Sequence, residues 1–500
     1  MVLKQCQLLL DLSPDIDTWN DSKYGAFLRF SSLHSLSTVR KSWALYIGTQ
    51  DFSKSEMDSL RAEFRNASCI KDGNENNFAA NMASLRSAGP LCYEVYKSGP
   101  KQFDDRYWKT DVTFDEPGKV VKANEINPTF AYSVTGKGFA VHSGSGFDPI
   151  LSFHLAETLA PISGSQLNKA ITTSGLVKGA VEEFRRWCLA FNKRVKEGPS
   201  LIIRFLVGNA ITACRALHYC AINSSIDPGL YAAPWSTTLM KLDGGDYAEN
   251  ASARAPLQFN VIDTSNLIDH IGFLNVLVPC RPLMQTKPSS VIFTNKLATD
   301  DEDDRMTQDT FLELLCGDLS VLAMILDLIP VSYISNFTSH SDAHERMAAA
   351  PGSGQFHRHI AWRIGTLSDS TAIGGNTQLN QRLKFDEEQL TNFIYDVYLN
   401  MFPSEDITWI RHADPASRLR RLIKLSKVHY TRFTLAYLLR FVKDRIDVNW
   451  EDVMGRLHDV IGRDRRLVTR SNNIQDLFCG LHLLSAHIFG SLLPNFNGNL

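Results

Sequence analysis

Apolar runs alternate with longer amphipathic stretches in the centre of the chain, between residues 200 and 297. The segment "SLIIRFLVGNAITACRALHYC" predicts a buried strand, a Gly-Asn turn and a helix, in that order. The segment "FNVIDTSNLIDHIGFLNVLVPCRPL" repeats this order, and "PSSVIFTNKL" predicts a third strand. Near-continuous apolar strands that alternate with helices are typical of a parallel sheet covered on both faces. We therefore expect an α/β core in this region.

The flanking segments have different patterns, and they divide the chain into three predicted parts. Residues 1–90 are predicted to be mainly helical, because apolar residues recur there at a spacing of three and four. Residues 91–300 are the predicted α/β core, with an inserted β-hairpin region around residues 135–138. Residues 301–500 are predicted to form a large, mainly helical C-terminal domain.

Two segments rich in glycine are predicted to be loops. The first, "HSGSGFDP", precedes a helix that Asp148 is suited to cap. We interpret it as a structural turn, because Gly144-x-Gly146 lacks the third glycine of a nucleotide-binding loop. The second, "APGSGQFHRH", contains His357 and His359, whose spacing would suit a metal ion in a strand. Since no third ligand is suggested nearby, we predict a solvated loop there and no metal site.

The composition is that of an ordinary globular protein with two or three structural units. Hydrophobic residues make up 44% of the 500 residues, and a net charge of −2 gives no global reason to expect nucleic acid or membrane binding. The nine cysteines contain no C-x-x-C pair, which argues against a disulfide framework and a finger-type zinc site. The N-terminus has no secretory signal, and the apolar runs are too short to span a bilayer. We therefore predict a cytoplasmic location, with the nucleus as the alternative, and no membrane partner.

The charge is distributed unevenly along the chain. Residues 411–470 contain 15 Lys and Arg against 7 Asp and Glu, a balance of about +8, so the remainder carries about −10. A basic helical segment of this kind could face an acidic partner or RNA. The alternative, which we prefer, is a solvated helix face that pairs with the acidic remainder, so a nucleic-acid partner is not expected.

Three central segments together resemble a known family. They are "RFLVGNA", "FNVIDTSNLIDHIGFLN" and "SSVIFTNKL", and "NPTFAYSVTGKGFAVHSG" and "DVNWEDVMGRLHDVI" also fit. From about residue 90 to its C-terminus, the chain is similar to fungal, mainly basidiomycete, proteins that carry the domain of unknown function 4470, often beside a MYND zinc finger. That domain is related to the N-terminal part of a dynein axonemal assembly factor. The family has no established activity, so the resemblance implies a fold more than a function.

The implied fold is α/β, with a partial Rossmann-like, methyltransferase-like parallel sheet beside the hairpin region and the helical C-terminal domain. The family's first strand with its Gly-rich turn of the type GDLRN, and the acidic end of its second strand, have no counterpart in this sequence. The MYND finger is also missing, because the closely spaced Cys pairs that it requires do not occur. We interpret the chain as a fragment, a truncated gene model or a degenerate paralogue of the family.

A methyltransferase of this fold holds its cofactor at the C-terminal ends of the strands. The resemblance places Gly208 and Asn209 after one strand, and Asp263, Ser265 and Asn266 after the next, as candidate cofactor contacts. Family members often have an acid where Asn209 stands, so this position departs from the family pattern. The alternative is turn and cap chemistry, because these residue types satisfy free backbone N–H groups where a strand gives way to a helix.

Two functions fit these observations. The preferred one is a non-catalytic protein-interaction or assembly scaffold on a methyltransferase-like fold, with a protein partner and no cofactor. The alternative is a methyltransferase that uses S-adenosylmethionine and whose first strands are unrecognised or lost. A pocket around Gly208, Asn209 and Asp263 would favour the enzyme, whereas strand ends plugged by side chains would favour the scaffold.

Overall fold

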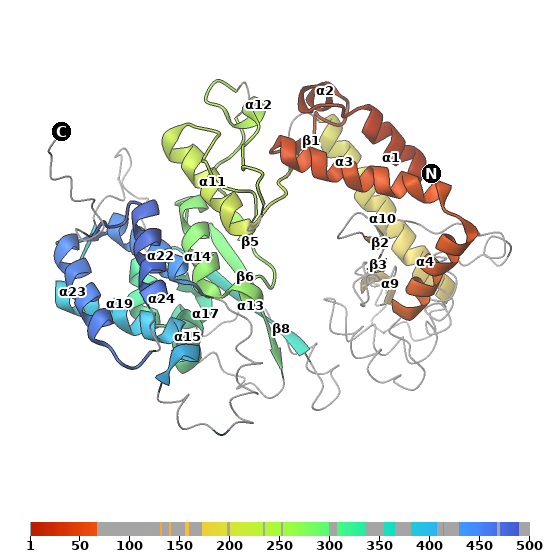
Figure 1. The fold of residues 1–500 in the computed structure, drawn as a ribbon. Helices are drawn as coiled ribbons and strands as arrows, with labels where there is room; N and C mark the ends of the chain where they lie inside the picture. The colour runs from red at the N-terminus through yellow and green to blue at the C-terminus, as the bar shows by residue number, and fades with distance from the viewer. Residues whose placement is uncertain are drawn as a thin grey trace. The chain divides into compact units, whose positions relative to one another are not determined.

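Figure 1 shows the computed structural model of the chain as a ribbon. The described residues are 2–67, 118, 131–132, 140–141, 156–159, 173–197, 201–233, 236–251, 254–299, 308–335, 355–365, 382–407, 414, 430–467 and 471–489. The proposed turn at residues 144–148, the side chain of His357 and much of the basic segment 411–470 therefore lie outside them.

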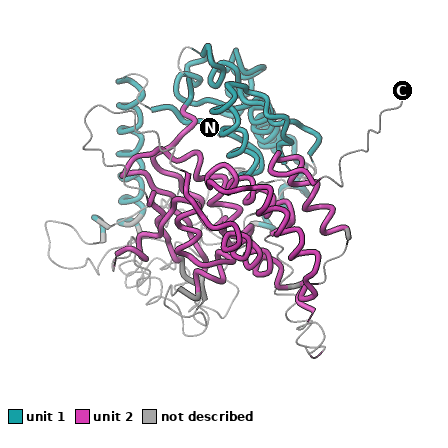
Figure 2. The backbone as a smooth tube through the Cα atoms, turned by 90° about the vertical axis from the view of Figure 1, so that its left-hand side faces the viewer, with its two compact units in different colours: residues 1–255, 298–301, 341–357 teal, residues 256–297, 302–340, 358–500 magenta. Residues whose placement is uncertain are grey.

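The chain divides into two compact units, which Figure 2 shows in two colours. Unit 1 comprises Met1–Ala255, Ala298–Asp301 and Ser341–His357, and unit 2 comprises Pro256–Leu297, Glu302–His340 and Arg358–Leu500. The main division follows residue 255, inside the segment 91–300 that the sequence pattern groups as one core. The three-part division by sequence stays a prediction.

Unit 1 is built mainly from helices, with short strands between them. Its helices are α1 Val2–Asp11, α2 Ile16–Asp21, α3 Leu33–Gly48, α4 Lys54–Ala67, α9 Ala156–Leu159, α10 Thr173–Lys196, α11 Ala210–Asn223 and α12 Gly244–Tyr247, with a 3-10 turn at Thr49–Asp51. Its strands are β1 Leu28–Phe30, β2 Ala131–Tyr132, β3 Ala140–Val141 and β4 Ile203–Phe205. The antiparallel pairing of β2 with β3 confirms the predicted hairpin.

An aromatic cluster forms the core of unit 1 beside α2 and α3. Trp19, Phe30 and Leu36 are each at most 3% exposed, and the rings of Trp19 and Phe30 lie 5.3 Å apart, edge to face. The indole Nε1 of Trp19 donates to the carbonyl of Leu28 at 2.8 Å, so the buried polar atom of the ring is satisfied. This bond ties α2 to β1.

Strand β1 is one short strand in an N-terminal segment whose described residues are otherwise mainly helical, as predicted. It pairs in parallel with β4, with Leu28 opposite Ile203 and Phe30 opposite Phe205. A strand of three residues has too few positions to show a period of two, and its partner strand lies far along the chain. The sequence pattern of the flanking helices therefore gave no prediction of this strand.

Unit 2 combines a four-stranded sheet with a larger set of helices. Its strands are β5 Val261–Asp263, β6 Val291–Thr299, β7 Ile329–Pro330, β8 Gln355–Arg363, β9 Leu383–Lys384 and β10 Ile446–Asp447. Its helices are α13 Ile268–Ile271, α14 Phe273–Cys280, α15 Gln308–Leu315, α16 Leu319–Leu326, α17 Val331–Ile334, α19 Glu387–Met401, α22 Arg432–Arg445, α23 Trp450–Arg463 and α24 Ser471–Leu483, with 3-10 turns at Arg281–Leu283 and Pro403–Glu405.

The sheet of unit 2 has the order β5-β6-β8-β7, and its first three strands are labelled in Figure 1. Strands β5 and β6 are parallel, with Val261 opposite Val291, and β7 is antiparallel to β8. The predicted strand–helix–strand order from β5 through α13 and α14 to β6 is confirmed. The protein is a mixed α/β protein with small parallel and mixed sheets, and β4 and β5 belong to different sheets.

Strand β8 shows that the predicted loop at "QFHRH" is wrong. Arg358, Ile360 and Trp362 are 8%, 3% and 1% exposed, and this spacing of two places them on one face of the strand. The indole of Trp362 donates to Thr294 Oγ1 on β6 at 2.9 Å. The Gly-Pro composition just before the strand suggested a loop, but tertiary packing decides the strand itself.

The C-terminal helices pack in pairs, α19 against α23 and α22 against α24. Arg432 fixes this region, because its guanidinium donates to both carboxylate oxygens of Glu405, at 2.8 and 2.6 Å. The same guanidinium lies 3.6 Å from the centre of the Phe402 ring, a cation–π contact. The mainly helical character predicted here holds for these helices, although β7, β8, β9 and β10 also lie in this part.

Candidate functional site

The turn after β4 contains the first two candidate residues, Gly208 and Asn209. Asn209 is the N-cap of α11, and its Oδ1 accepts hydrogen bonds from the N–H groups of Ile211, at 3.0 Å, and Thr212, at 3.2 Å. Two hydrogen bonds use both lone pairs of the amide oxygen. The oxygen of Asn209 therefore serves the helix end.

A neighbouring loop covers the Gly208 side of this turn. A Cβ atom on Gly208 would lie 2.6 Å from Cε of Met240 and 3.0 Å from the carbonyl oxygen of Ala232. The same carbonyl accepts the N–H of Asn209 at 2.7 Å, and Ala232 and Met240 are each 1% exposed. A side chain at this position would have to displace the flexible end of Met240. Gly208 itself is exposed, so this packing closes only the side of the turn on which a Cβ atom would stand.

The turn after β5 contains the other three candidates. Asp263 Oδ1 accepts the N–H of Ser265 at 2.8 Å, which closes an Asx-turn, and Ser265 has a φ of +48°. The carbonyl of Ser265 accepts the N–H of Asn295 on β6 at 2.9 Å. The carbonyl of Asn266 accepts the N–H of Asp269 at 3.1 Å, at the start of α13. Asp263 and Ser265 are exposed, and Asn266 is half-buried.

The candidates thus form two groups within separate turns. Gly208 and Asn209 lie together in unit 1, after a strand of the β1–β4 sheet. Asp263, Ser265 and Asn266 lie together in unit 2, after the first strand of the four-stranded sheet. In each group the polar atoms for which contacts are described bond to nearby backbone, as turn and cap chemistry requires.

A buried ionic cluster in unit 1 escaped the sequence analysis. Asp246, 4% exposed, accepts from Arg204 Nε at 2.7 Å and lies 4.0 Å from Arg29 Nη1. Arg29 and Arg204 face each other in the β1–β4 register, so both arginines reach the same carboxylate. The signal was present as the matching triplets "LRF" and "IRF", but it has meaning only once the two strands are known to pair.

Asp243 stands next to this cluster and caps α12. Its Oδ2 accepts the N–H of Asp246 at 3.2 Å. Burial, and then the nearby negative charge of Asp246, raise the pKa of the Asp243 carboxyl above its ordinary value. Two close carboxyls with different environments are a pattern that acid–base catalysis can use, but here both are engaged in holding the fold.

A second buried ionic cluster lies in unit 2. Asp327 ends α16 in the left-handed region, with a φ of +53°, and its Oδ2 lies 2.5 Å from Arg281 Nη2. The guanidinium of Arg445 lies 3.9 Å from the same oxygen and donates to the carbonyl of Ile325 at 2.8 Å. These groups link α16, α22 and the turn after α14, so we assign them a structural role.

Burial raises the pKa of two potential nucleophiles in unit 2, Cys316 and Tyr430. Burial raises the pKa of the Cys316 thiol to about 12. Burial also raises the pKa of the Tyr430 hydroxyl far above its ordinary value, and that hydroxyl accepts the N–H of Leu274 at 3.3 Å. A thiol acts as a nucleophile through its thiolate, which is scarce at neutral pH when the pKa is this high. Neither group is suited to nucleophilic catalysis.

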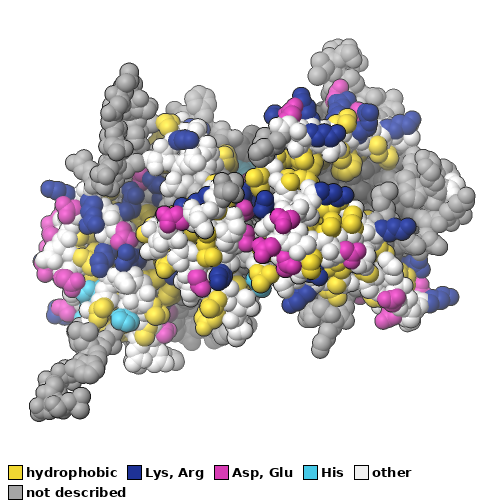
Figure 3. Space-filling model, turned by 90° about the horizontal axis from the view of Figure 1, so that it is seen from above, with side chains coloured by type: hydrophobic (Ala, Val, Ile, Leu, Met, Phe, Trp, Pro, Cys, Tyr) yellow, Lys and Arg dark blue, Asp and Glu magenta, His cyan; other side chains and the backbone are white. Residues whose placement is uncertain are grey.

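Most of the basic side chains of segment 411–470 that the structure describes have partners within the chain, whereas Arg456 and Arg465 are exposed. Arg440 pairs with Asp444, Arg463 with Asp459, and Arg466 with Asp464 and the hydroxyl of Tyr395, while Arg432, Lys443 and Arg445 bond to residues of unit 2. On the face that Figure 3 draws, basic and acidic side chains are interspersed. These pairs agree with the interpretation that this segment is a helix face whose charges pair with acidic residues of the same chain.

Within the described ranges, no group of three or more His, Cys, Asp or Glu side chains is arranged to hold a metal ion. Among the helices that the structure describes, none is both long and apolar enough to cross a membrane. His359 lies half-buried in β8. Comparison of the chain with protein families, with curated proteins and with solved structures finds no match in any of the three.

Proposed function

We propose that the protein is a non-catalytic protein-interaction or assembly scaffold built on a methyltransferase-like fold. The observation that carries this proposal is that the amide oxygen and the backbone N–H of Asn209, in the turn after β4, are hydrogen-bonded within the chain. Methyltransferases of this type need backbone that can closely approach the cofactor at the strand ends. Here Met240 and Ala232 pack against Gly208, and the amide oxygen of Asn209 caps α11. A turn whose polar groups already bond within the chain favours a scaffold over an enzyme.

The parallel pair β5–β6 supports the methyltransferase-like part of the proposal. These strands are joined through α13 and α14, and parallel strands linked by a helix are the repeating unit of Rossmann-like sheets. The sequence segments that resemble the fungal family with the domain of unknown function 4470 include both strands and the turn between them. We therefore propose a distant relationship to that family and, through it, to the dynein axonemal assembly factor.

A protein is the partner that this proposal favours. Most of the described arginines and the lysine of segment 411–470 bond within the chain, which leaves them less able to neutralise phosphates. A cytoplasmic location, with the nucleus as the alternative, stays a prediction.

Calorimetric titration of the folded chain with S-adenosylmethionine and S-adenosylhomocysteine tests the proposal. We expect no binding heat at millimolar ligand. Asp263→Ala removes the Asx-turn acceptor, whereas the control Asp263→Asn keeps it and removes the charge. Binding in the micromolar range that both Asp263 variants weaken would refute the scaffold and favour the methyltransferase. A lower melting temperature for Asp263→Ala than for Asp263→Asn, without ligand binding, is the result that agrees with a structural turn.

A further inference from the structure

An apolar crevice lies between α23 and α24 in unit 2. Leu457 and Ile461 line it from α23, and Leu477 and Leu481 line it from α24, with His458 and Phe489 also in its wall. The crevice is small, with a cavity volume of about 30 Å³. Phe489 does not belong to either helix, so a third segment of chain completes this wall.

That segment, residues 484–489, which we name the strap, begins where α24 ends. Ser485 adopts the left-handed conformation, with a φ of +53°. The N–H of Ala486 bonds to the carbonyl of Leu481 at 2.8 Å, and the N–H of Ser485 to that of His482 at 2.9 Å. These two bonds form a Schellman motif, which reverses the chain direction at a helix end. The strap therefore turns back from α24 instead of continuing its direction.

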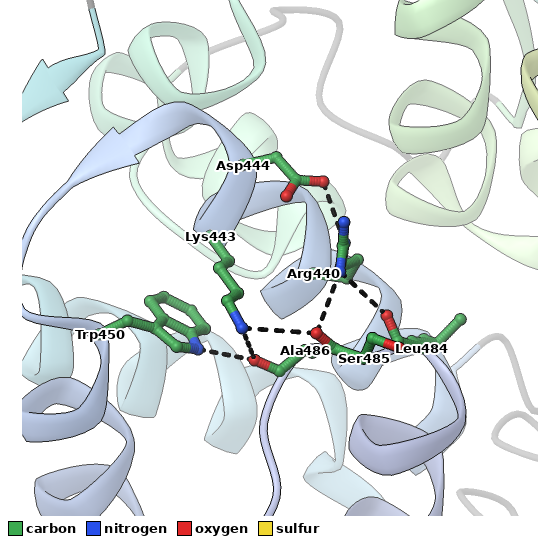
Figure 4. Close-up of polar contacts among 7 residues, drawn as sticks. All are labelled: Arg440, Lys443, Asp444, Trp450, Leu484, Ser485 and Ala486. Carbon is green, nitrogen blue, oxygen red and sulfur yellow. Dashed lines mark hydrogen bonds and ion pairs between the residues drawn. The ribbon is translucent and has the colours of Figure 1, made fainter. Parts of the chain in front are cut away.

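Three side chains from α22 and α23 hold the strap by its backbone (Figure 4). Arg440 donates to the carbonyls of Leu484 and Ser485, and Lys443 donates to the carbonyls of Ser485 and Ala486, the latter at 2.8 Å. The indole of Trp450 donates to the carbonyl of Ala486 at 2.9 Å. The strap is thus fixed by hydrogen bonds to carbonyl groups, several of them from cations.

The tip of the strap closes over the crevice with aromatic contacts. The ring of Phe489 lies 4.3 Å from that of Phe478 and 5.1 Å from that of His458. His487 is 8% exposed and packs edge-on against Phe489 at 4.4 Å. Burial of His487 and the position of Phe489 are therefore coupled.

The groups that face His487 come from α22 and α23. Glu451 Oε2 lies 3.4 Å from His487 Nδ1, although the Glu451 side chain is 75% exposed. Burial is the main cause that lowers the pKa of His487, and the positive charges of Lys443 and His458 lower it further, while Glu451 opposes them. A proton on His487 would add positive charge beside the ammonium of Lys443, which already holds the strap.

We propose that residues 484–489 are a releasable strap, in which Phe489 closes the α23–α24 crevice and protonation of His487 frees the strap and opens the crevice. The closed form favours neutral His487, whose pKa in it lies below the ordinary value. The closed form is therefore fully favoured above the ordinary histidine pKa of about 6.5 and weakens as the pH falls below it. The proposed release of the strap does not depend on the scaffold proposal.

Hydrogen exchange of the full chain, read by mass spectrometry at about pH 7.5 and about pH 5.5 and corrected for intrinsic rates, tests the strap. The amides of Ala486 and His487 report closure, because both bond to the Leu481 carbonyl. We expect these two amides to lose protection at the lower pH while α22 keeps its own. An unchanged protection of the strap would overturn the proposal.

Variants of His487 distinguish protonation of this side chain from a loss of stability of the whole protein at low pH. His487→Phe keeps an aromatic ring against Phe489, and His487→Gln keeps a polar group, but neither can take up a proton at these pH values. Both are expected to abolish the pH response, whereas the control His482→Phe, at an exposed histidine of α24, is expected to keep it. A pH response that survives in both His487 variants, with α22 still protected, would show that His487 is not the trigger.

Discussion

Replacing Asn209 separates helix capping from cofactor binding at the turn after β4. The amide oxygen of Asn209 accepts two backbone N–H groups at the start of α11, and an alanine would leave both without that acceptor. Loss of an Asn N-cap lowers protein stability by about 0.5–2 kcal/mol. Because two bonds are lost in a part-buried turn, we expect Asn209→Ala to fall in the upper half of this range.

Asn209→Asp is the matched control. It keeps the acceptor oxygen and places a negative charge at a helix N-terminus, which contributes about 0.3–1 kcal/mol of stabilisation at an exposed site. We therefore expect Asn209→Asp to unfold at or above the parent's temperature. Asn209→Asp also introduces the acidic residue that is frequent at this position in the family that the sequence resembles. The variant can therefore also be used to test cofactor binding.

The assay is thermal unfolding followed by far-ultraviolet circular dichroism, supported by hydrogen exchange of the α11 amides. For a unit of roughly this size, 1 kcal/mol shifts the melting temperature by about 2–4 °C. Hydrogen exchange assigns the loss to the first turn of α11, since only unit 1 contains this helix. Equal melting temperatures for the parent and Asn209→Ala, or equal losses for both variants, would refute the capping argument.

Three further substitutions test other parts of the structure. Gly272 has a φ of +82°, and a Cβ atom there would lie 2.6 Å from the Tyr430 ring. Gly272→Ala should therefore lower the free energy of unfolding, measured by denaturant titration, by about 2–5 kcal/mol. The control Gly455→Ala, at a helical glycine with open space around it, should raise this free energy by about 0.5–1 kcal/mol. The raised pKa of Asp243 means that the folded state favours its protonated form. The stabilisation by this proton is present below the unfolded pKa of about 3.9 and is lost as the pH rises through the folded pKa. Asp243→Asn should therefore raise the free energy of unfolding at neutral pH and make it depend less on pH in the acid range. Ser485 occupies a left-handed C′ position that glycine prefers, so Ser485→Gly should raise the melting temperature through a gain of up to about 1 kcal/mol, and a decrease would contradict the Schellman assignment.

Local sequence signals predicted those parts of the fold that depend on neighbouring residues. The order of strand, Gly-Asn turn and helix around Asn209 follows from a cap residue that stands between an apolar run and a helical repeat. The parallel pair β5–β6 could be expected because a helix separates two apolar runs. Strand β1 could not, because Leu28–Phe30 acquires its role only by pairing with a segment far along the chain. The ionic cluster at Asp246 depends on the same pairing, since Arg29 and Arg204 meet only across it.

The candidate site was harder to predict, because capping and ligand binding use the same residue types. Asn, Asp, Ser and Gly satisfy free backbone groups at a strand–helix junction, and the same groups hold a cofactor in a methyltransferase. The difference lies in whether the acceptor atoms are already used. At Asn209 both lone pairs of Oδ1 are occupied by N–H groups of α11, and Met240 packs beside the neighbouring glycine. At Asp263 the carboxylate is exposed, and the one bond described for it uses a single site on Oδ1. Because a carboxylate offers about four acceptor sites, Asp263 keeps capacity that Asn209 lacks, which makes it the more decisive residue in the titration with S-adenosylmethionine.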